Sequence, residues 1–320
     1  MTGGALVKAD GGGGDGLWST AGNWNQEPAS PAFLVFGGTT GLENENDLTT
    51  HFDAETPFVL SGLLFAEGAG AFSITGNPID FTARTVVNRS SEVQTLNLTI
   101  QVDNSVGGVG FDTGDGEIVL NALALRNGFN TPLDKSGSGT LSITGELDGP
   151  DTFQANVTEG KLYADVGENL FFHCTIAAGG TLEIGPRAAN GCIHNGGNVT
   201  NDGTLVLGEN TFEDVGDLGG SGVVTNAGGD GTLATIALRN TRAREFSGSI
   251  EDGANGGQTS LQIGLSGRTN PEVFTLSGAN TYTGDTVIGQ PFAQFHLTET
   301  GSLRFGIGAD GESNRITALA

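Results

Sequence analysis

The chain has 320 residues and carries 37 acidic against 13 basic residues, which gives a net charge of −24. A surface that binds nucleic acid needs clustered Lys and Arg to displace counterions from phosphates, and the densest basic group here is Arg239, Arg242 and Arg244. The composition therefore excludes nucleic acid as a partner and disfavours docking on anionic lipid headgroups. The sequence holds no apolar run of about 18 residues, so we also expect no insertion into a membrane.

Residues 1–32 are predicted to form a glycine-rich N-terminal cap or linker, ahead of the first alternating strand FLVFGG at 33–38. This segment holds both tryptophans of the chain, Trp18 and Trp24, in the run DGLWSTAGNWN. We expect the two indoles to cover the end of the core that follows, because the open end of a repeat protein needs a cap. The opening residues MTGGALVKADGGGG lack the apolar segment of a secretory signal peptide, so no export signal is visible.

A short motif of the form Gly-x-Leu-x-apolar recurs through the remainder of the chain, residues 33–320. Its copies are GTLSI at 139, GKLYA at 160, GTLEI at 180, GTLVL at 203 and, in looser form, GTLAT at 231 and GSLRF at 301. Sustained helical spacing of apolar residues is absent from the sequence, so we expect an all-β chain. Repetition at intervals of about 20 to 25 residues in β-forming sequence is typical of a solenoid, and we predict a parallel β-helix with coils of about 20–25 residues.

Alternation within the motif assigns an inward and an outward face. In the copy at 180, Leu182 points to one side of the strand, while Thr181 and Glu183 point to the other. We expect the inward leucines of successive copies, Leu162, Leu182 and Leu205, to stack in a dry column. This column is the predicted core of the solenoid.

The segment FTLSGANTYTGDTVIG at 274–289 resembles the passenger-associated repeat of autotransporters and related large secreted bacterial proteins. That repeat usually has a form close to L-x-L-x-G-x-N-T-Y-x-G-x-T-x-V-x-x-G. The residues that carry the resemblance are Leu276, Gly278, Asn280, Thr281, Tyr282, Gly284, Thr286, Val287 and Gly289. The family implies a right-handed β-helix that is exported and displayed at the bacterial cell surface or outside the cell, with a structural or adhesive role. It does not imply catalysis.

Cys174 and Cys192 are the two cysteines of the chain, and their separation of 18 residues is close to one predicted coil. In an exported protein we favour a disulfide that staples two coils. Two free buried thiols are the first alternative. The second is a zinc site completed by His173 and His194, which is less favoured because His173 and Cys174 point to opposite faces of one strand.

Several acidic residues lie in short polar segments between predicted strands, such as Asp112 and Asp115 in FDTGDGE and Glu213, Asp214 and Asp217 in FEDVGD. A lyase or hydrolase on a β-helix needs carboxylates paired with a base or with each other, and no such pairing is visible. We interpret these segments as solvated turns and predict a chain that is not an enzyme and has no catalytic residue. We likewise expect no cofactor and no metal site; specific calcium binding by the acidic glycine-rich turns is the alternative left open.

Two classes of function remain. The first is a non-catalytic structural or adhesive protein outside the cell or on its surface, whose solenoid ends stack head to tail into a filament. Its other expected partners are a surface glycan or a host or neighbouring cell. The second class is a β-helix that binds or cleaves carbohydrate, which depends on analogy of fold alone.

Overall fold

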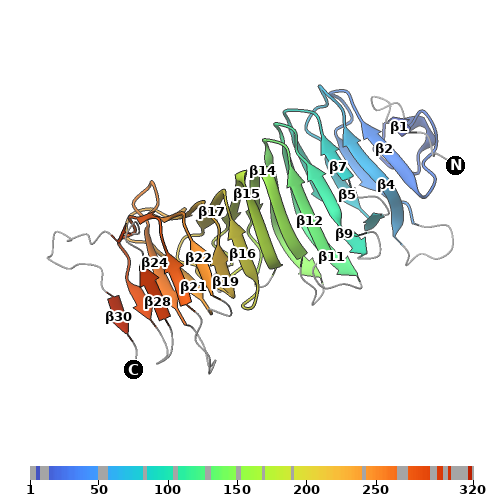
Figure 1. Cartoon of the computed structure of the whole chain (residues 1–320). Coiled ribbons are helices and arrows are strands. Elements are labelled where there is room, and N and C mark those ends of the chain that lie inside the picture. The colour runs from blue at the N-terminus through green and yellow to red at the C-terminus, as the bar shows by residue number, and fades with distance from the viewer. Residues whose placement is uncertain are drawn as a thin grey trace. The chain divides into compact units, whose positions relative to one another are not determined.

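We describe the chain from a computed structural model. The described residues are 5–7, 14–49, 57–81, 85–103, 107–126, 131–148, 153–167, 170–188, 191–239, 243–264, 273–288, 294–297, 302–303 and 316–318. This part of the chain is all-β, with a single 3-10 turn, η1 (Ala21–Asn23), as its helical element (Figure 1). Within it no helix has the length and apolar character required to cross a membrane.

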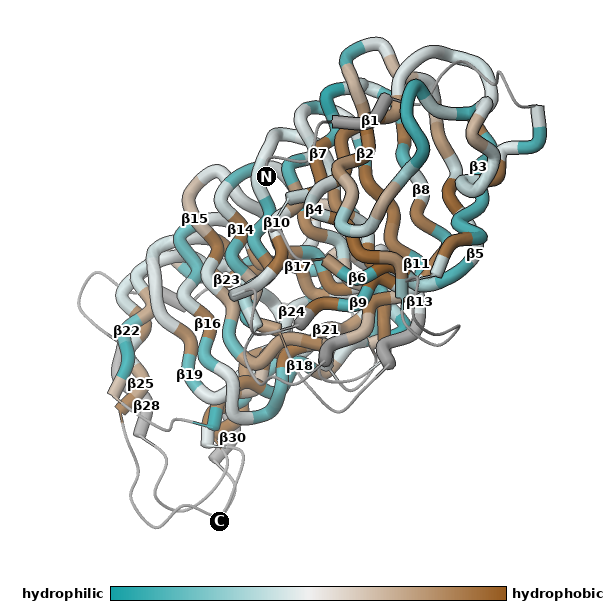
Figure 2. Tube along the Cα trace, turned by 90° about the vertical axis from the view of Figure 1, so that its right-hand side faces the viewer, coloured by the Kyte–Doolittle hydropathy of each residue, from teal (hydrophilic) through white to brown (hydrophobic). Residues whose placement is uncertain are grey.

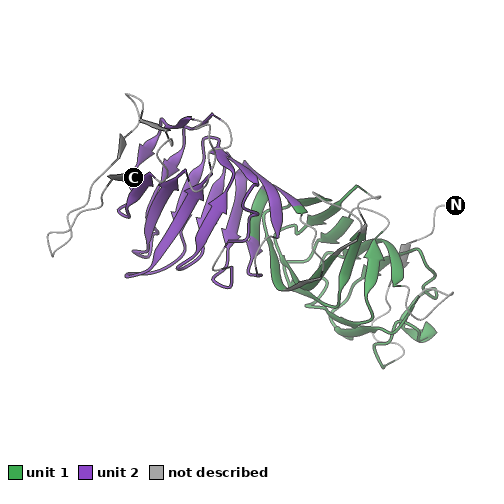
Figure 3. Ribbon diagram, turned by 90° about the horizontal axis from the view of Figure 1, so that it is seen from below, with its two compact units in different colours: residues 1–153, 159–162 green, residues 154–158, 163–320 purple. Residues whose placement is uncertain are grey.

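The chain divides into two compact units, shown in green and purple in Figure 3. Unit 1 comprises residues 1–153 and 159–162, and unit 2 comprises residues 154–158 and 163–320. The strand β14 (Phe153–Ala164) therefore contributes residues to both units.

Unit 1 is built from parallel strands that form three rows. The first row is β1–β2–β4–β7–β10–β12, the second is β3–β5–β8–β11–β13, and the third is β4–β6–β9–β11. The strands are β1 (Ala5–Val7), β2 (Ala32–Phe36), β3 (Glu43–Asn46), β4 (Phe58–Phe65), β5 (Ser73–Gly76), β6 (Ile79–Phe81), β7 (Thr85–Asn88), β8 (Val93–Asn97), β9 (Ile100–Asp103), β10 (Val109–Asp112), β11 (Glu117–Arg126), β12 (Thr131–Ser136) and β13 (Thr140–Asp148).

Unit 2 repeats this plan with three further rows of parallel strands. One row contains β15, β16 and β19, another contains β15, β17, β20 and β23, and the third contains β18, β21, β24, β27 and β30; β22, β25 and β28 also pair in order, as do β26 and β29. The strands are β15 (Phe171–Ile184), β16 (Asn198–Asn201), β17 (Thr204–Leu207), β18 (Phe212–Val215), β19 (Asp217–Gly219), β20 (Val223–Asn226), β21 (Leu233–Leu238), β22 (Arg244–Phe246), β23 (Ser249–Ile250), β24 (Gln258–Ile263), β25 (Val273–Leu276), β26 (Ala279–Asn280), β27 (Thr286–Ile288), β28 (Gln294–Leu297), β29 (Ser302–Leu303) and β30 (Ile316–Ala318).

These registers confirm the predicted parallel β-helix. Each strand pairs with the equivalent strand of the next coil, as in the series Leu182, Leu205, Val224 and Ile250. The steps along this series are 23, 19 and 26 residues, a wider range than the predicted coil of about 20–25 residues. The strands keep their register while the corners absorb the difference in length, since loops tolerate insertion far better than paired strands do.

The core follows the alternation of the sequence, and Figure 2 shows hydrophobic stretches running through the strands of the coils. Leu182 and Leu205 are register partners and are fully buried, as predicted, whereas Thr181 and Glu183 are half-exposed. Burial of each such leucine stabilises the fold by about 1.5–3 kcal/mol relative to an exposed side chain. The predicted column is thus confirmed for the members that lie in unit 2.

Buried asparagines close several corners between strands. Asn88 is the last residue of β7 and is fully buried. Its Oδ1 accepts the backbone N–H of Ser90 at 2.9 Å, and its Nδ2 donates to the carbonyl of Glu117 on the next coil at 3.2 Å. Asn226 at the end of β20 does the same, accepting from Gly228 and donating to the carbonyl of Gln258. Each amide therefore completes a turn and joins it to the following coil, which satisfies backbone groups that burial would otherwise leave unpaired.

Candidate functional site

The predicted cap residues Trp18 and Trp24 lie at the first coil of unit 1. Trp18 is fully buried, Trp24 is 5% exposed, and their rings meet edge to face with centroids 6.1 Å apart. Both rings contact Phe36 of β2, and the Trp24 indole N–H donates to the Trp18 carbonyl at 2.9 Å. The predicted segment 1–32 also contains β1, which pairs with β2, so coil structure begins inside that segment.

The segment that resembles a passenger repeat forms a corner of unit 2. Asn280 is fully buried, and its Oδ1 accepts the backbone N–H of Ile250 on the preceding coil at 2.9 Å. Tyr282 is 2% exposed, and its hydroxyl lies 2.5 Å from that of Thr286. Burial raises the pKa of Tyr282 to about 12, so the phenol stays neutral. The named residues of the motif thus have a packing role in this coil.

The glycines of the same motif lie where the chain approaches its neighbouring coil. A Cβ at Gly278 would be 1.8 Å from the carbonyl oxygen of Gly248, and a Cβ at Gly284 would be 2.3 Å from that of Thr259. Leu276 is buried in β25, Thr281 is exposed with its backbone N–H donating to Ile250, and Val287 pairs with Gln262. Gly289 lies outside the described residues.

Cys174 and Cys192 are free thiols in this structure, and both are buried. The predicted disulfide is not formed. The register explains why one coil does not bring them opposite each other: Cys174 pairs with Val199, and Phe171 pairs with Ile193, so the coil step here is 25 and 22 residues rather than 18. Burial raises the pKa of both thiols well above the ordinary value, which keeps them protonated and poorly nucleophilic.

The interpretation of FEDVGD as a solvated turn is wrong, because Glu213 is buried. Its carboxyl group is fully buried and accepts the backbone N–H groups of Cys192 at 3.0 Å and Ile193 at 2.7 Å. Burial raises the pKa of Glu213 to about 8, against the lowering effect of these two hydrogen bonds. Asp214 and Asp217 are also buried, at 6% and 2% exposure, so the segment contributes an acidic interior rather than a wet corner.

Asp214 is neutralised by Arg239 from the end of the neighbouring strand β21. The guanidinium donates through Nε at 2.8 Å and through Nη2 at 2.5 Å to the two carboxylate oxygens. This bidentate, largely buried ion pair occupies both oxygens of Asp214.

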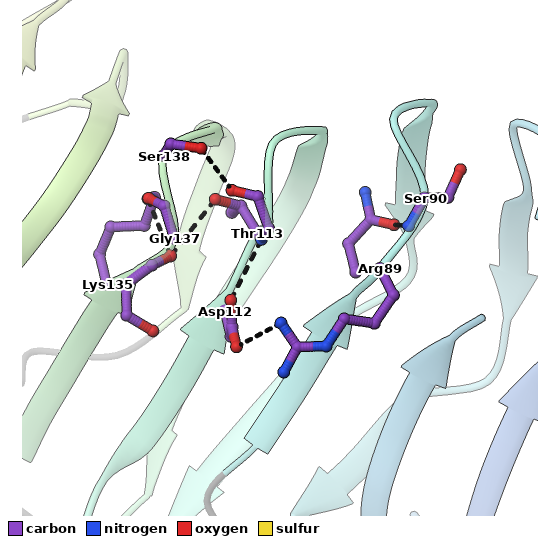
Figure 4. A network of polar contacts seen from close by, with 10 residues as sticks. Arg89, Ser90, Asp112, Thr113, Lys135, Gly137 and Ser138 are labelled. Atoms are coloured by element: carbon purple, nitrogen blue, oxygen red, sulfur yellow. Dashed lines mark hydrogen bonds and ion pairs between the residues drawn. The ribbon is translucent and has the colours of Figure 1, made fainter. Parts of the chain in front are cut away.

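Lys135 is a buried ionisable residue of unit 1, and no motif of the sequence singles it out. Its Nζ donates to the carbonyls of Ser136, Gly137 and Glu159 at 3.0, 2.7 and 3.0 Å. Figure 4 shows its side chain beside the corner that follows β12. Burial lowers the pKa of Lys135 to about 8, against the opposite effect of the nearby carboxylates of Glu159 and Asp112.

Asp112 is tied into the same network of unit 1. Its carboxylate lies 2.9 Å from the Arg89 guanidinium of the preceding coil and accepts the backbone N–H of Gly114 (Figure 4). Asp112 is therefore a corner residue rather than a free carboxylate, and this ion pair, half exposed on the arginine side, adds little to stability.

The two histidines beside the cysteines flank the ring of Phe172. The centroid distances to this ring are 4.5 Å for His173 and 5.1 Å for His194. Each Nδ1 accepts a backbone N–H, from Asn198 at 2.9 Å and from Gly196 at 3.2 Å. Among the residues that the structure describes, no group of three or more His, Cys, Asp or Glu side chains is placed to hold a metal ion.

A row of short polar side chains crosses four coils on the outward face of unit 1. We call Ser73, Asn97, Asn121 and Thr144 the polar ladder. Asn97 donates to the Ser73 hydroxyl at 3.5 Å, Asn121 donates to the side-chain Oδ1 of Asn97, and Thr144 donates to the side-chain Oδ1 of Asn121 at 2.8 Å. The side chains thus link β5, β8, β11 and β13 through their exposed faces.

The chain was also compared with known proteins, and no protein-family model, no curated protein and no solved structure matches it. The parallel β-solenoid is accordingly established by the strand registers, and the resemblance of residues 274–289 to a passenger repeat remains a prediction.

Proposed function

We propose that the chain is a non-catalytic structural and adhesive module of the autotransporter-passenger type, displayed at a bacterial cell surface or outside the cell. The observation that carries this proposal is the polar ladder of unit 1. It presents amide and hydroxyl groups at regular coil spacing on a parallel sheet whose inward side chains are mostly apolar. Exposed Glu43 and Glu45 of β3 pair with Ser73 and Thr75, so carboxylates border the ladder on this face. A regular row of hydrogen-bonding groups suits contact with an extended, repeating partner.

The chemistry of the ladder favours a neutral partner. Thr75 and Thr95 lie on the same face of β5 and β8 as the ladder residues and extend its hydroxyl-rich character. Amide and hydroxyl groups donate and accept hydrogen bonds in the way that sugar hydroxyls require. A net charge of −24 would repel a polyanion at low ionic strength, so we expect a neutral polysaccharide to be preferred over an acidic one.

The adhesive part of this proposal is tested with beads that carry the full chain. Protein-coated and albumin-coated beads are washed over surfaces of cellulose, dextran or alginate, and the retained fraction is counted. We expect several-fold greater retention of protein-coated beads on a neutral polysaccharide. Equal retention of both kinds of bead on every surface would contradict adhesion.

The structural part concerns self-association through the solenoid ends. An uncapped end of a parallel solenoid carries backbone groups that can pair with another strand, and a head-to-tail contact that does not close on itself propagates into a filament. Electron microscopy of the purified chain tests this: long regular fibres support the filament, and short monodisperse rods contradict it.

The alternative is a β-helix that binds or cleaves carbohydrate. The polar ladder favours binding as the mode of contact. For cleavage, the acidic segment at 213–217 is poorly suited, because Glu213 faces the core and both oxygens of Asp214 are held by Arg239. Release of reducing ends from a polysaccharide by the purified chain would favour cleavage over adhesion.

A further inference from the structure

Glu213 occupies a core position in the third row of unit 2. Its register partner is Ile236, which pairs in turn with Leu261 and then Thr286. Glu213, Ile236 and Leu261 are fully buried, and Thr286 is 2% exposed. The other coils place an apolar or hydroxyl side chain at this point, whereas this coil places a carboxyl group there. A buried carboxyl in such a column has a cost that an apolar residue would avoid.

The carboxyl group is hydrogen-bonded to a short segment of the preceding coil, Gly191–Ile193, which we call the latch segment. Two successive backbone N–H groups of this segment, those of Cys192 and Ile193, donate to the two oxygens of Glu213. Gly191 has a φ of +103°, and a Cβ at this position would be 3.1 Å from Glu213 Oε1. The latch segment therefore approaches the carboxyl closely along its backbone, and Glu213 anchors it from the core side.

Both thiols lie near this carboxyl group, and burial and this carboxyl group raise the pKa of each of them. Cys192 belongs to the latch segment and is fully buried, and Cys174 on β15 is 2% exposed. The titratable groups that act on Glu213 or share its surroundings are these two thiols and the carboxylates of Asp214 and Asp165. None of these four groups supplies a positive charge, and the nearby Arg239 is engaged with Asp214.

We propose that Glu213 is a pH-sensitive latch: its neutral carboxyl holds the latch segment, with Cys192 in it, in the buried position near Cys174, and its ionisation releases the segment. Ionisation opens the latch because a buried carboxylate gains hydration when the segment moves away, and the two N–H bonds offset only part of that gain. Access to the thiols then depends on pH, although neither thiol is exposed in the closed form. This device is independent of adhesion and of the polar ladder, which lies in unit 1.

The direction and range of the effect follow from proton linkage. The carboxyl ionises near 8 when the latch is closed and near the ordinary value of 4.5 when it is open and hydrated. The closed form therefore binds the proton more tightly, and the opening constant rises by up to about tenfold for each pH unit between these values. Above a pH of about 8 the opening constant levels off, because both forms are then ionised.

Hydrogen exchange of the full chain from pH 5 to pH 8, followed by mass spectrometry of peptides that cover the latch segment, tests the proposal. After correction for intrinsic exchange, we expect the wild-type opening constant to rise steeply with pH and that of Glu213→Gln to stay flat. Glu209→Gln, which makes the same change at an exposed turn, should retain the wild-type slope. Equal slopes in wild type and Glu213→Gln would overturn the latch.

Two further measurements keep the result interpretable. Amides of β24, such as that of Leu261, should keep their protection over the same pH range, because the opening is local; a parallel loss there would indicate global unfolding and contradict the latch. Alkylation of Cys192 by iodoacetamide, corrected for the thiolate fraction, should accelerate from pH 5 to pH 8 in the wild type. If Glu213→Gln fails to fold, a wild-type alkylation rate that is constant after this correction would suffice to overturn the proposal.

Discussion

Lys135 and Phe111 are register partners on neighbouring coils of unit 1, and both side chains are completely buried. A cation thus stands in a column whose next member, Val86, is also fully buried. The ammonium is tolerated because three carbonyl oxygens at the corner accept hydrogen bonds from it. Lys135 thus donates hydrogen bonds to the backbone carbonyls of its corner. Two coils earlier the side-chain amide of Asn88 has the same role, donating to the carbonyls of Glu92 and Glu117.

Truncation of Lys135 is expected to be costly. Lys135→Ala leaves a cavity and removes one hydrogen bond from each of three carbonyl oxygens, so we expect a loss of about 2–4 kcal/mol in the free energy of unfolding. Lys161→Ala, at a half-exposed position of β14, should cost less than about 1 kcal/mol. Urea unfolding followed by circular dichroism measures both, and equal losses would show that the corner contacts of Lys135 do not stabilise the coil.

The lowered pKa of Lys135 should also make the free energy of unfolding depend on pH. The folded chain holds the pKa at about 8, below the ordinary 10.5, so the unfolded chain binds more protons between these values. Stability therefore rises with pH across this window by up to about 1.4 kcal/mol per pH unit, and falls as pH drops toward 8. Urea midpoints from pH 8 to pH 10.5 for wild type and Lys135→Met measure the contribution; parallel curves would contradict it.

We expect a buried corner asparagine to contribute more to stability than an exposed asparagine in the corresponding turn of the next coil. Asn226→Ala removes hydrogen bonds to Gly228 and Gln258 at a side chain that is 3% exposed, and should cost about 1–3 kcal/mol. Asn255→Ala, at an exposed turn position, should change stability by less than about 0.5 kcal/mol. Thermal unfolding of the two variants compares them directly, and a smaller effect for Asn226 would refute the stapling role of the corner amide.

We expect the glycines of residues 274–289 to be required because a side chain at these positions would clash with the backbone of the preceding coil. Gly278→Ala places a methyl group against the Gly248 carbonyl, and we expect a loss of more than about 2 kcal/mol or failure to accumulate folded protein. Gly167→Ala, with no heavy atom within 4 Å of its new Cβ, should be close to neutral. Soluble yield and the urea midpoint of each variant check this pair, and a neutral Gly278→Ala would show that the coils can separate to accept the methyl group.

The polar ladder offers a prediction about adhesion that is separable from stability. The double variant Asn97→Ala with Asn121→Ala removes exposed amides, so we expect a stability change below about 1 kcal/mol and a several-fold drop in bead retention on a neutral polysaccharide. Thr225→Ala in unit 2 is the matched control on another outward face. Undiminished retention by a folded double variant would remove the ladder from the adhesive surface.

The alternation of apolar and polar residues was sufficient to predict which side chains point inward, where that alternation continues along the chain. Leu182 and Leu205 were placed correctly because each stands in a five-residue motif that repeats. Glu213 could not be placed in this way, since the run FEDVGD has no apolar alternation to orient it. Its inward direction becomes visible only through its pairing with Ile236, which is 23 residues away.

The cysteine pair shows a second limit of the sequence. A separation of 18 residues suggests neighbours on adjacent coils only if every coil has the same length. The step measured at Cys174 is 25 residues, because the corner after β15 is long, and the two thiols therefore stand out of register. Corner lengths depend on turn contacts that a single sequence does not specify.

The tolerance of the corners for different lengths has a practical meaning. Between Leu205 and Val224 the chain needs 19 residues to complete its circuit, and between Val224 and Ile250 it needs 26, yet the same inward column continues. The inward column therefore maintains the fold, while the corners can differ in length and sequence from coil to coil. Gly231, with open space around its Cβ position, marks one place where a foreign peptide could be displayed without disturbing the coils beneath it.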